Sequence, residues 1–154
     1  MFPFKNEQDL YHSRELRRYY KKLYTSLNAS VDSLKDPSMN INQILKNLGK
    51  RLLDHGVQRQ HYNIFGRALI STLIENLGAS YTPEIENAWV LFFVQTTNSM
   101  VSTHYDQPRV DYINITDEQK AIIKESWVDA KDLGYDAIGL ALIKHIFRLR
   151  PDSL

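Results

Sequence analysis

A chain of 154 residues with 43% apolar and 24% charged side chains suits one globular domain with its own core, and this composition excludes a disordered chain. The net charge of +1 gives no global field that favours nucleic acid or a membrane surface, and the absence of cysteine excludes disulfides and thiolate metal sites. No apolar run reaches the roughly 18 residues of a membrane span, and residues 1–5 lack the apolar core of a signal peptide. A cytoplasmic location is the default expectation.

Helical spacing of apolar residues begins after the first dozen positions. Ser13 is a predicted N-cap for a helix that runs to about Leu34, and Pro37 stands in the break that follows. The apolar stripe of this helix is Leu16, Tyr20, Leu23, Tyr24, Leu27 and Val31. A second helix is predicted over residues 41–54, and Gly56 stands at the usual helix-stop position.

Two longer helices are predicted in the middle of the chain. The first covers residues 60–77 and ends at Gly78. The second opens at Thr82 and Pro83, because threonine is a good cap and proline suits the first helical position, and it runs to about Tyr105.

The last part of the chain carries two more predicted helices. A linker over 110–115 leads to Thr116, which forms a predicted capping box with Gln119 at the start of a helix that runs through Trp127. The final helix covers residues 135–149. Since no stretch keeps the period of two that strands require, we expect an all-α domain.

The motifs of these segments resemble the globin family. ITDEQKAIIKESW at 115–127 is similar to the first globin helix, and GLALIKHIFRLRPDSL at 139–154 is similar to the second. Phe2-Pro3-Phe4 resembles the turn that follows, in which a phenylalanine packs on haem. The segments 14–31, 43–57, 61–78 and 81–106 resemble, in this order, the distal helix, the proximal helix and the last two helices.

The resemblance implies a globin fold in circularly permuted order. Globin helices C to H occupy residues 1–107, a linker covers 108–115, and helices A and B occupy 116–154. A natural permutation, an engineered one and a frame cut from a tandem globin array are equally compatible with this order.

The resemblance also predicts where the haem iron ligand should stand. In globins the proximal histidine falls three residues after the Leu-Gly pair and five before the valine that corresponds to Val57, and both counts give Leu52. A leucine side chain cannot bind iron. His55 is three residues further on, nearly one helical turn away. It is either a surface or propionate-facing residue or, after a shift of the helix, a fallback iron ligand.

Tyr19 aligns with the distal position, where it either fills an empty pocket or interacts with haem. A phenol can donate to a bound ligand and a phenolate can bind ferric iron, which makes Tyr19 the other fallback ligand. Leu23 matches the apolar gate, and Ile143 and Phe147 match pocket walls. The residues that the resemblance places around haem, if haem is bound, are Phe2, Tyr19, Leu23, Leu52, His55, Val57, Tyr62 and Ile143.

The remaining polar clusters have ordinary interpretations. The other histidines, which show no ligand-like pairing, are His12, His61, His104 and His145. Basic residues share one face of the first helix at Arg17, Arg18, Lys21 and Lys22. This face is a solvated surface or, as an alternative, a site for an anionic partner.

Because the proximal position holds leucine, the sequence favours a haem-free globin domain without a cofactor. Its expected role is structural or in protein interaction, with other copies or neighbouring globin domains as partners. No catalytic constellation appears, so an enzyme is not expected. The alternative is a haem-binding globin that binds, carries or senses oxygen or another diatomic gas through non-standard iron ligation.

Overall fold

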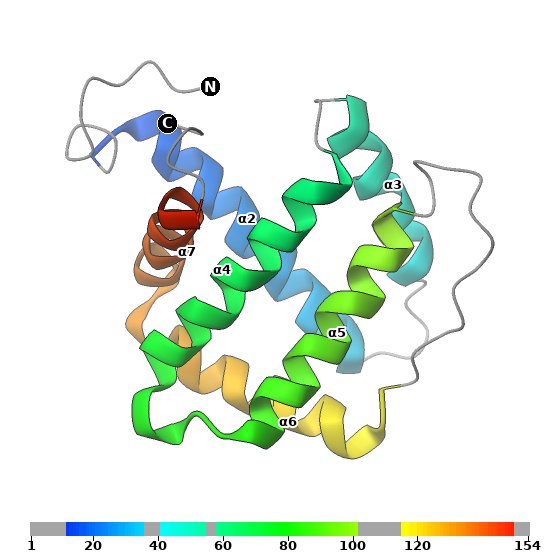
Figure 1. Cartoon of the computed structure of the whole chain (residues 1–154), viewed down its shortest axis with the longest axis vertical. Coiled ribbons are helices and arrows are strands. Elements are labelled where there is room, and N and C mark those ends of the chain that lie inside the picture. Colours follow the sequence, from blue (N-terminus) through cyan, green and yellow to red (C-terminus); the bar gives the residue numbers. More distant parts are fainter. Residues whose placement is uncertain (1–11, 36–40, 55–57, 102–114, 150–154) are drawn as a thin grey trace.

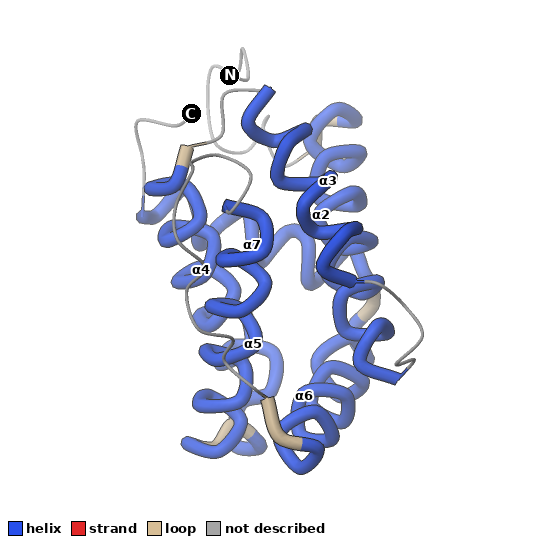
Figure 2. The backbone as a smooth tube through the Cα atoms, turned by 90° about the vertical axis from the view of Figure 1, so that its right-hand side faces the viewer, coloured by secondary structure: helices blue, strands red, loops and turns tan. Residues whose placement is uncertain are grey.

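The computed structural model describes residues 12–35, 41–54, 58–101 and 115–149. Its elements, labelled as in Figure 1, are α2 (Arg14–Asp32), η1 (Ser33–Lys35), α3 (Ile41–Asp54), α4 (Arg59–Leu77), η2 (Gly78–Ser80), α5 (Pro83–Val101), α6 (Asp117–Ala130), η3 (Lys131–Leu133) and α7 (Tyr135–Leu149). Within these ranges there is no strand, and Figure 2 draws the described residues as helices with a few short loop segments. The expectation of an all-α fold is confirmed.

The helix starts follow the caps that the sequence predicts. The Ser13 hydroxyl accepts hydrogen bonds from the backbone N–H groups of Glu15 and Leu16. At α6 the Thr116 hydroxyl accepts from the Gln119 N–H at 3.1 Å, and the Gln119 side chain accepts from the Thr116 N–H at 3.0 Å. This is the predicted capping box.

One helix end differs from the prediction, and a second predicted end lies outside the described residues. The first helix becomes a short 3-10 turn at Ser33, where α-helical geometry ends. The helix predicted to reach Tyr105 is described to Val101. The stops at Gly78 and Gly134 have φ angles of 53° and 89°, which glycine adopts without the Cβ clash of other residues.

The helices pack in a crossed arrangement around α4 and α5, which lie side by side (Figure 1). Helix α7 packs against both α2 and α4, and α6 packs against α5, α4 and α2. Helix α3 packs against α5. The last two helices therefore cover surfaces made by the earlier ones. In the described part of the chain, no helix is long and apolar enough to cross a membrane.

A single cluster of buried side chains forms most of the core. We call it the main cluster, and it consists of Leu27, Val31, Ala68, Leu69, Leu73, Leu77, Ala88, Trp89, Phe92, Ile115, Ile123, Trp127, Ala130, Ile138 and Leu142. Trp89 and Trp127 are its largest members, with 0% and 1% of their surface exposed. Their ring centroids lie 5.8 Å apart.

Each buried indole N–H has an acceptor on another helix. Trp89 Nε1 donates to Ser126 Oγ at 2.9 Å, and Trp127 Nε1 donates to Asn28 Oδ1 at 2.9 Å. Lys131 Nζ donates to the same Asn28 oxygen at 3.1 Å. These bonds tie α5 to α6 and α6 to α2.

The acceptor role of Asn28 predicts a measurable loss of stability. Asn28→Ala leaves the buried Trp127 N–H without its partner, so we expect the free energy of unfolding to fall by about 1–3 kcal/mol in urea denaturation. Asn87→Ala removes an exposed amide of α5 and is the control, with an expected change within about 0.5 kcal/mol. Equal stability of the two variants would show that the Asn28 bond does not hold α6 on α2.

Candidate functional site

Six buried apolar side chains lie outside the main cluster. We call them the upper apolar set: Leu16, Leu45, Tyr62, Met100, Ile143 and Phe147, each at most 8% exposed. They come from α2, α3, α4, α5 and α7. A second apolar region supplied by this many helices is a candidate site, because ligand sites in helical proteins form between helices.

Four members of this set stand at helix ends. Leu16 is in the first turn of α2, Tyr62 in the first turn of α4, Met100 in the last turn of α5 and Phe147 in the last turn of α7. These four ends and α3 lie in the upper part of the molecule as drawn in Figure 1. The main cluster draws on α6, on α4 and α5, and also on α2 and α7 through Leu27, Val31, Ile138 and Leu142.

The predicted site residues fall in three groups. Tyr62 and Ile143 belong to the upper apolar set, with 5% and 2% of their surface exposed. Tyr19 and Leu23 are on α2 and Leu52 is on α3, but their side chains lie outside what the structure describes. Phe2, His55 and Val57 lie outside the described residues.

Burial keeps the phenol of Tyr62 uncharged. Burial raises the pKa of the Tyr62 phenol above its usual value near 10, so this side chain stays neutral at physiological pH. Two buried apolar neighbours from α7, Ile143 and Phe147, give the same region an uncharged lining. Such a lining suits a flat apolar ring system such as a porphyrin.

Helix α3, which carries the position predicted for the proximal ligand, is held by a close backbone contact. A Cβ atom at Gly49 would overlap the backbone carbonyl of Met100 on α5. Only glycine allows the two backbones to approach this closely. In the sequence, Gly49 belongs to the Leu-Gly pair of the globin motif, and the structure gives it a packing role.

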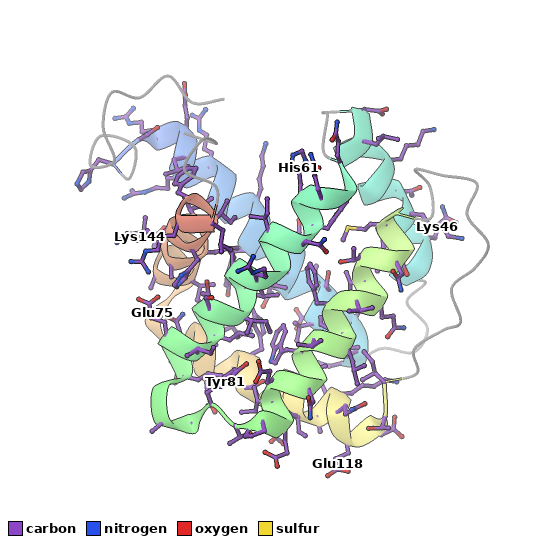
Figure 3. The ribbon with its side chains drawn as sticks, in the orientation of Figure 1. Lys46, His61, Glu75, Tyr81, Glu118 and Lys144 are labelled. Atoms are coloured by element: carbon purple, nitrogen blue, oxygen red, sulfur yellow. The ribbon has the colours of Figure 1, made fainter. Side chains whose placement is uncertain are left out.

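The described histidines have local roles that do not supply an iron ligand. His61, labelled in Figure 3, lies in the first turn of α4, and its Nδ1 accepts the Gln58 N–H at 2.8 Å. Its ring proton is therefore on Nε2, which then has no lone pair for a metal. His145 Nε2 lies 2.8 Å from Glu75 Oε2, and His12 is exposed. Among the described residues, no group of three or more His, Cys, Asp or Glu side chains is placed to hold a metal ion.

The described histidines and the buried apolar side chains thus differ in how well they suit haem. The lining fits, since Tyr62, Ile143 and Phe147 are buried and uncharged. The two ligand candidates of the sequence, Tyr19 and His55, have side chains that lie outside the described part of the chain.

Comparison with known proteins adds independent information. The globin family model matches residues 1–100 of this chain. Neuroglobin of Tetraodon nigroviridis is 29% identical over 93 residues, which are 60% of this chain and 58% of that protein. Cytoglobin-2 of Danio rerio is 24% identical over 83 residues, or 53% of this chain and 46% of that protein.

A Flavohemoprotein of Bordetella pertussis is 27% identical over 79 residues, which are 51% of this chain and 19% of that protein. The chain thus spans less than two thirds of the length of each of these relatives. No solved structure matches the chain.

These similarities correct two expectations from the sequence. The prediction of a haem-free module and the prediction of no cofactor are both wrong, because the family match and the similarity to neuroglobin, cytoglobin and flavohemoprotein favour the haem-binding alternative. Both predictions gave decisive weight to Leu52. A single missing ligand removes one coordinate bond, whereas the apolar surface that holds a porphyrin is spread over several helices.

The close approach of α3 and α5 predicts that Gly49 is essential for stability. Gly49→Ala should lower the free energy of unfolding by about 1–3 kcal/mol, since the overlapping atoms are backbone and cannot rotate away. This loss should outweigh the gain of about 1 kcal/mol that alanine brings to a helix interior. Urea denaturation measures the net change in the free energy of unfolding. The control is Lys50→Ala at the neighbouring exposed residue. A more stable Gly49→Ala variant would refute the tight crossing.

Proposed function

Because the chain belongs to the globin family, we propose that it is a haem-binding globin that binds oxygen or another diatomic gas through non-standard iron ligation. The observation that carries the proposal is the upper apolar set, six buried apolar side chains that five helices supply outside the main cluster. Carriage and sensing of the gas are both compatible with this site.

The chain's own residues have distinct parts in this proposal. Tyr62, Ile143 and Phe147 form an uncharged wall that excludes water and favours the porphyrin by burial. Haem, when bound, supplies an iron that coordinates the gas. Tyr19 or His55 would hold the iron of a bound haem, and Leu52 would offer it an apolar contact at the position where the globin motif has histidine. The side chains predicted around the haem are otherwise Phe2, Leu23 and Val57.

We also propose the circularly permuted order. The family model stops at residue 100, and α6 and α7 follow it in the chain. Both helices pack on α2 and α4, which is where helices A and B are needed to cover a globin core. The proposed division is helices C to H over residues 1–107, a linker over 108–115, and helices A and B over 116–154.

Partners and activity complete the proposal. Other copies of the chain or neighbouring globin domains are the proposed partners. The proposed role is binding rather than catalysis, and the match to a Flavohemoprotein is too short, at 19% of that protein, to transfer any wider activity.

Haemin titration tests the proposed site. We expect a Soret band that saturates at about one haemin per chain, because the proposal assigns one site to the upper apolar set. Tyr19→Phe and His55→Ala should identify the ligand, since the variant that removes it shifts the band and weakens binding by about tenfold or more. Tyr81→Phe is the control: the Tyr81 hydroxyl is buried without a described partner, and the residue lies at the end of the molecule opposite His61 (Figure 3).

A Soret absorbance that rises linearly and does not saturate would contradict the proposal, because it indicates nonspecific adsorption of haemin. Equal spectra for wild type, Tyr19→Phe and His55→Ala would contradict the proposed ligation alone.

Restoring the family's ligand provides a second test. Leu52→His places an imidazole where both motif counts put the proximal ligand, so we expect ferrous haem to bind about tenfold more tightly or better. The measurement is the ferrous spectrum and its carbon monoxide complex, compared with Leu53→His at the neighbouring exposed position. Unchanged affinity in Leu52→His would show that α3 does not face the haem at this residue.

A further inference from the structure

A groove runs along the outer face of α4 and α5, on residues that the proposed haem site does not use. Its volume is about 510 Å³, and its lining includes Arg67 and Ile70 from α4 and Val90, Phe93 and Val94 from α5. No residue predicted to contact haem lines it. The groove is therefore a separate surface feature that calls for its own explanation.

Several exposed apolar side chains lie at or beside this groove. Val90 and Val94, one turn apart on α5, are 42% and 37% exposed, and Ile74, one turn after Ile70 on α4, is 47% exposed. Single exposed apolar residues are common, but a group of them on one helix pair marks an interaction surface. Elsewhere on the described chain, the large exposed apolar residues are Leu53 and Val128, which lie on α3 and α6.

The shape of the groove follows from a glycine. A Cβ at Gly66 would overlap the ring of Phe93, so this ring packs directly on the backbone of α4. Phe93, Val90, Val94 and Ile70 give the groove an apolar part, and Asn63, Ser71, Thr97 and Asn98 add polar groups to its lining. A groove between two helices can accept another helix.

Opposite charges flank the apolar part of this face. Arg67 precedes Ile70 by nearly one turn on α4, and Glu86 precedes Val90 by one turn on the exposed side of α5. Neither side chain forms an ion pair within the described chain. Since α4 and α5 run in opposite directions, the two charges approach the apolar patch from opposite ends (Figure 1).

The charges on this face can pair with the charges on the same face of a second copy. A two-fold axis that passes midway between Arg67 and Glu86 brings Arg67 of each copy to Glu86 of the other, and it sets the valines of both copies against each other. Interfaces between identical subunits are commonly of this isologous kind. An apolar centre with charged pairs at its edge is also their usual anatomy.

We propose that the α4–α5 face binds a second copy of this chain through a two-fold interface centred on Val90 and Val94, with Arg67 and Glu86 paired across it. The proposal rests on the partner suggested above, another copy, and adds the surface and its symmetry. It does not depend on haem, so its test leaves the proposed gas binding untouched.

Sedimentation velocity over a wide dilution series tests the interface. The wild-type chain should reach twice its 18.0 kDa mass at high concentration. Val90→Asp should weaken association by about tenfold or more, because it buries a charge at the centre of the interface. Val128→Asp places the same charge at an exposed valine of α6 and should leave association unchanged. Circular dichroism checks that each variant keeps its helices.

A charge exchange tests the symmetry. Arg67→Glu and Glu86→Arg should each weaken the dimer through like charges, and the double variant should restore it, since the pair is then reversed on both sides. Failure of the double variant to recover would overturn the two-fold pairing. A wild-type chain that stays monomeric throughout would overturn the interface and leave the groove to another helical protein or a small apolar molecule. A dimer insensitive to Val90→Asp would also overturn it, as expected if copies exchange α6 and α7 instead.

Discussion

The contact between Trp89 and Trp127 is the constraint on which the other packing depends. Two indoles in contact bury a large apolar area, and each buried N–H needs an acceptor. Those acceptors are Ser126 and Asn28, so α5, α6 and α2 must meet at one place. With these helices held, α7 fills the space between α2 and α4. The last two helices thereby become part of the core although they come after it in the chain.

This anchoring divides the apolar interior into two regions with different roles. The main cluster contains both tryptophans, whereas the upper apolar set lies outside this cluster and has four of its six members at helix ends. Helix α3 joins the second region through its close contact with α5 at Gly49. A region supplied by helix ends can adapt to a ligand without disturbing the tryptophan contacts. The structure thus combines a tryptophan-centred cluster with a second set of buried apolar side chains, and the proposed function assigns haem to the second set.

The helices could be predicted from the sequence, whereas the cofactor could not, and both outcomes have physical reasons. Ser13 and the Thr116–Gln119 pair are local signals, because a cap involves atoms only two or three residues apart. The His61 cap at α4 was missed, since histidine is not a usual capping residue. The exposed valines of α5 were also missed, because PEIENAWVLFFV is apolar on several sides and its free face depends on neighbours. Leu52 misled the cofactor prediction because ligand identity is local while porphyrin burial is distributed.

The division into a base and a site is tested most directly by amide hydrogen exchange, followed residue by residue with and without haemin. The account predicts that amides over residues 68–73 and 88–92, in the main cluster, are protected in both states. Amides in the first turn of α4 and the last turn of α7 should gain protection only when haemin is present. Protection that rises equally in all helices, or only in the main cluster, would contradict the account.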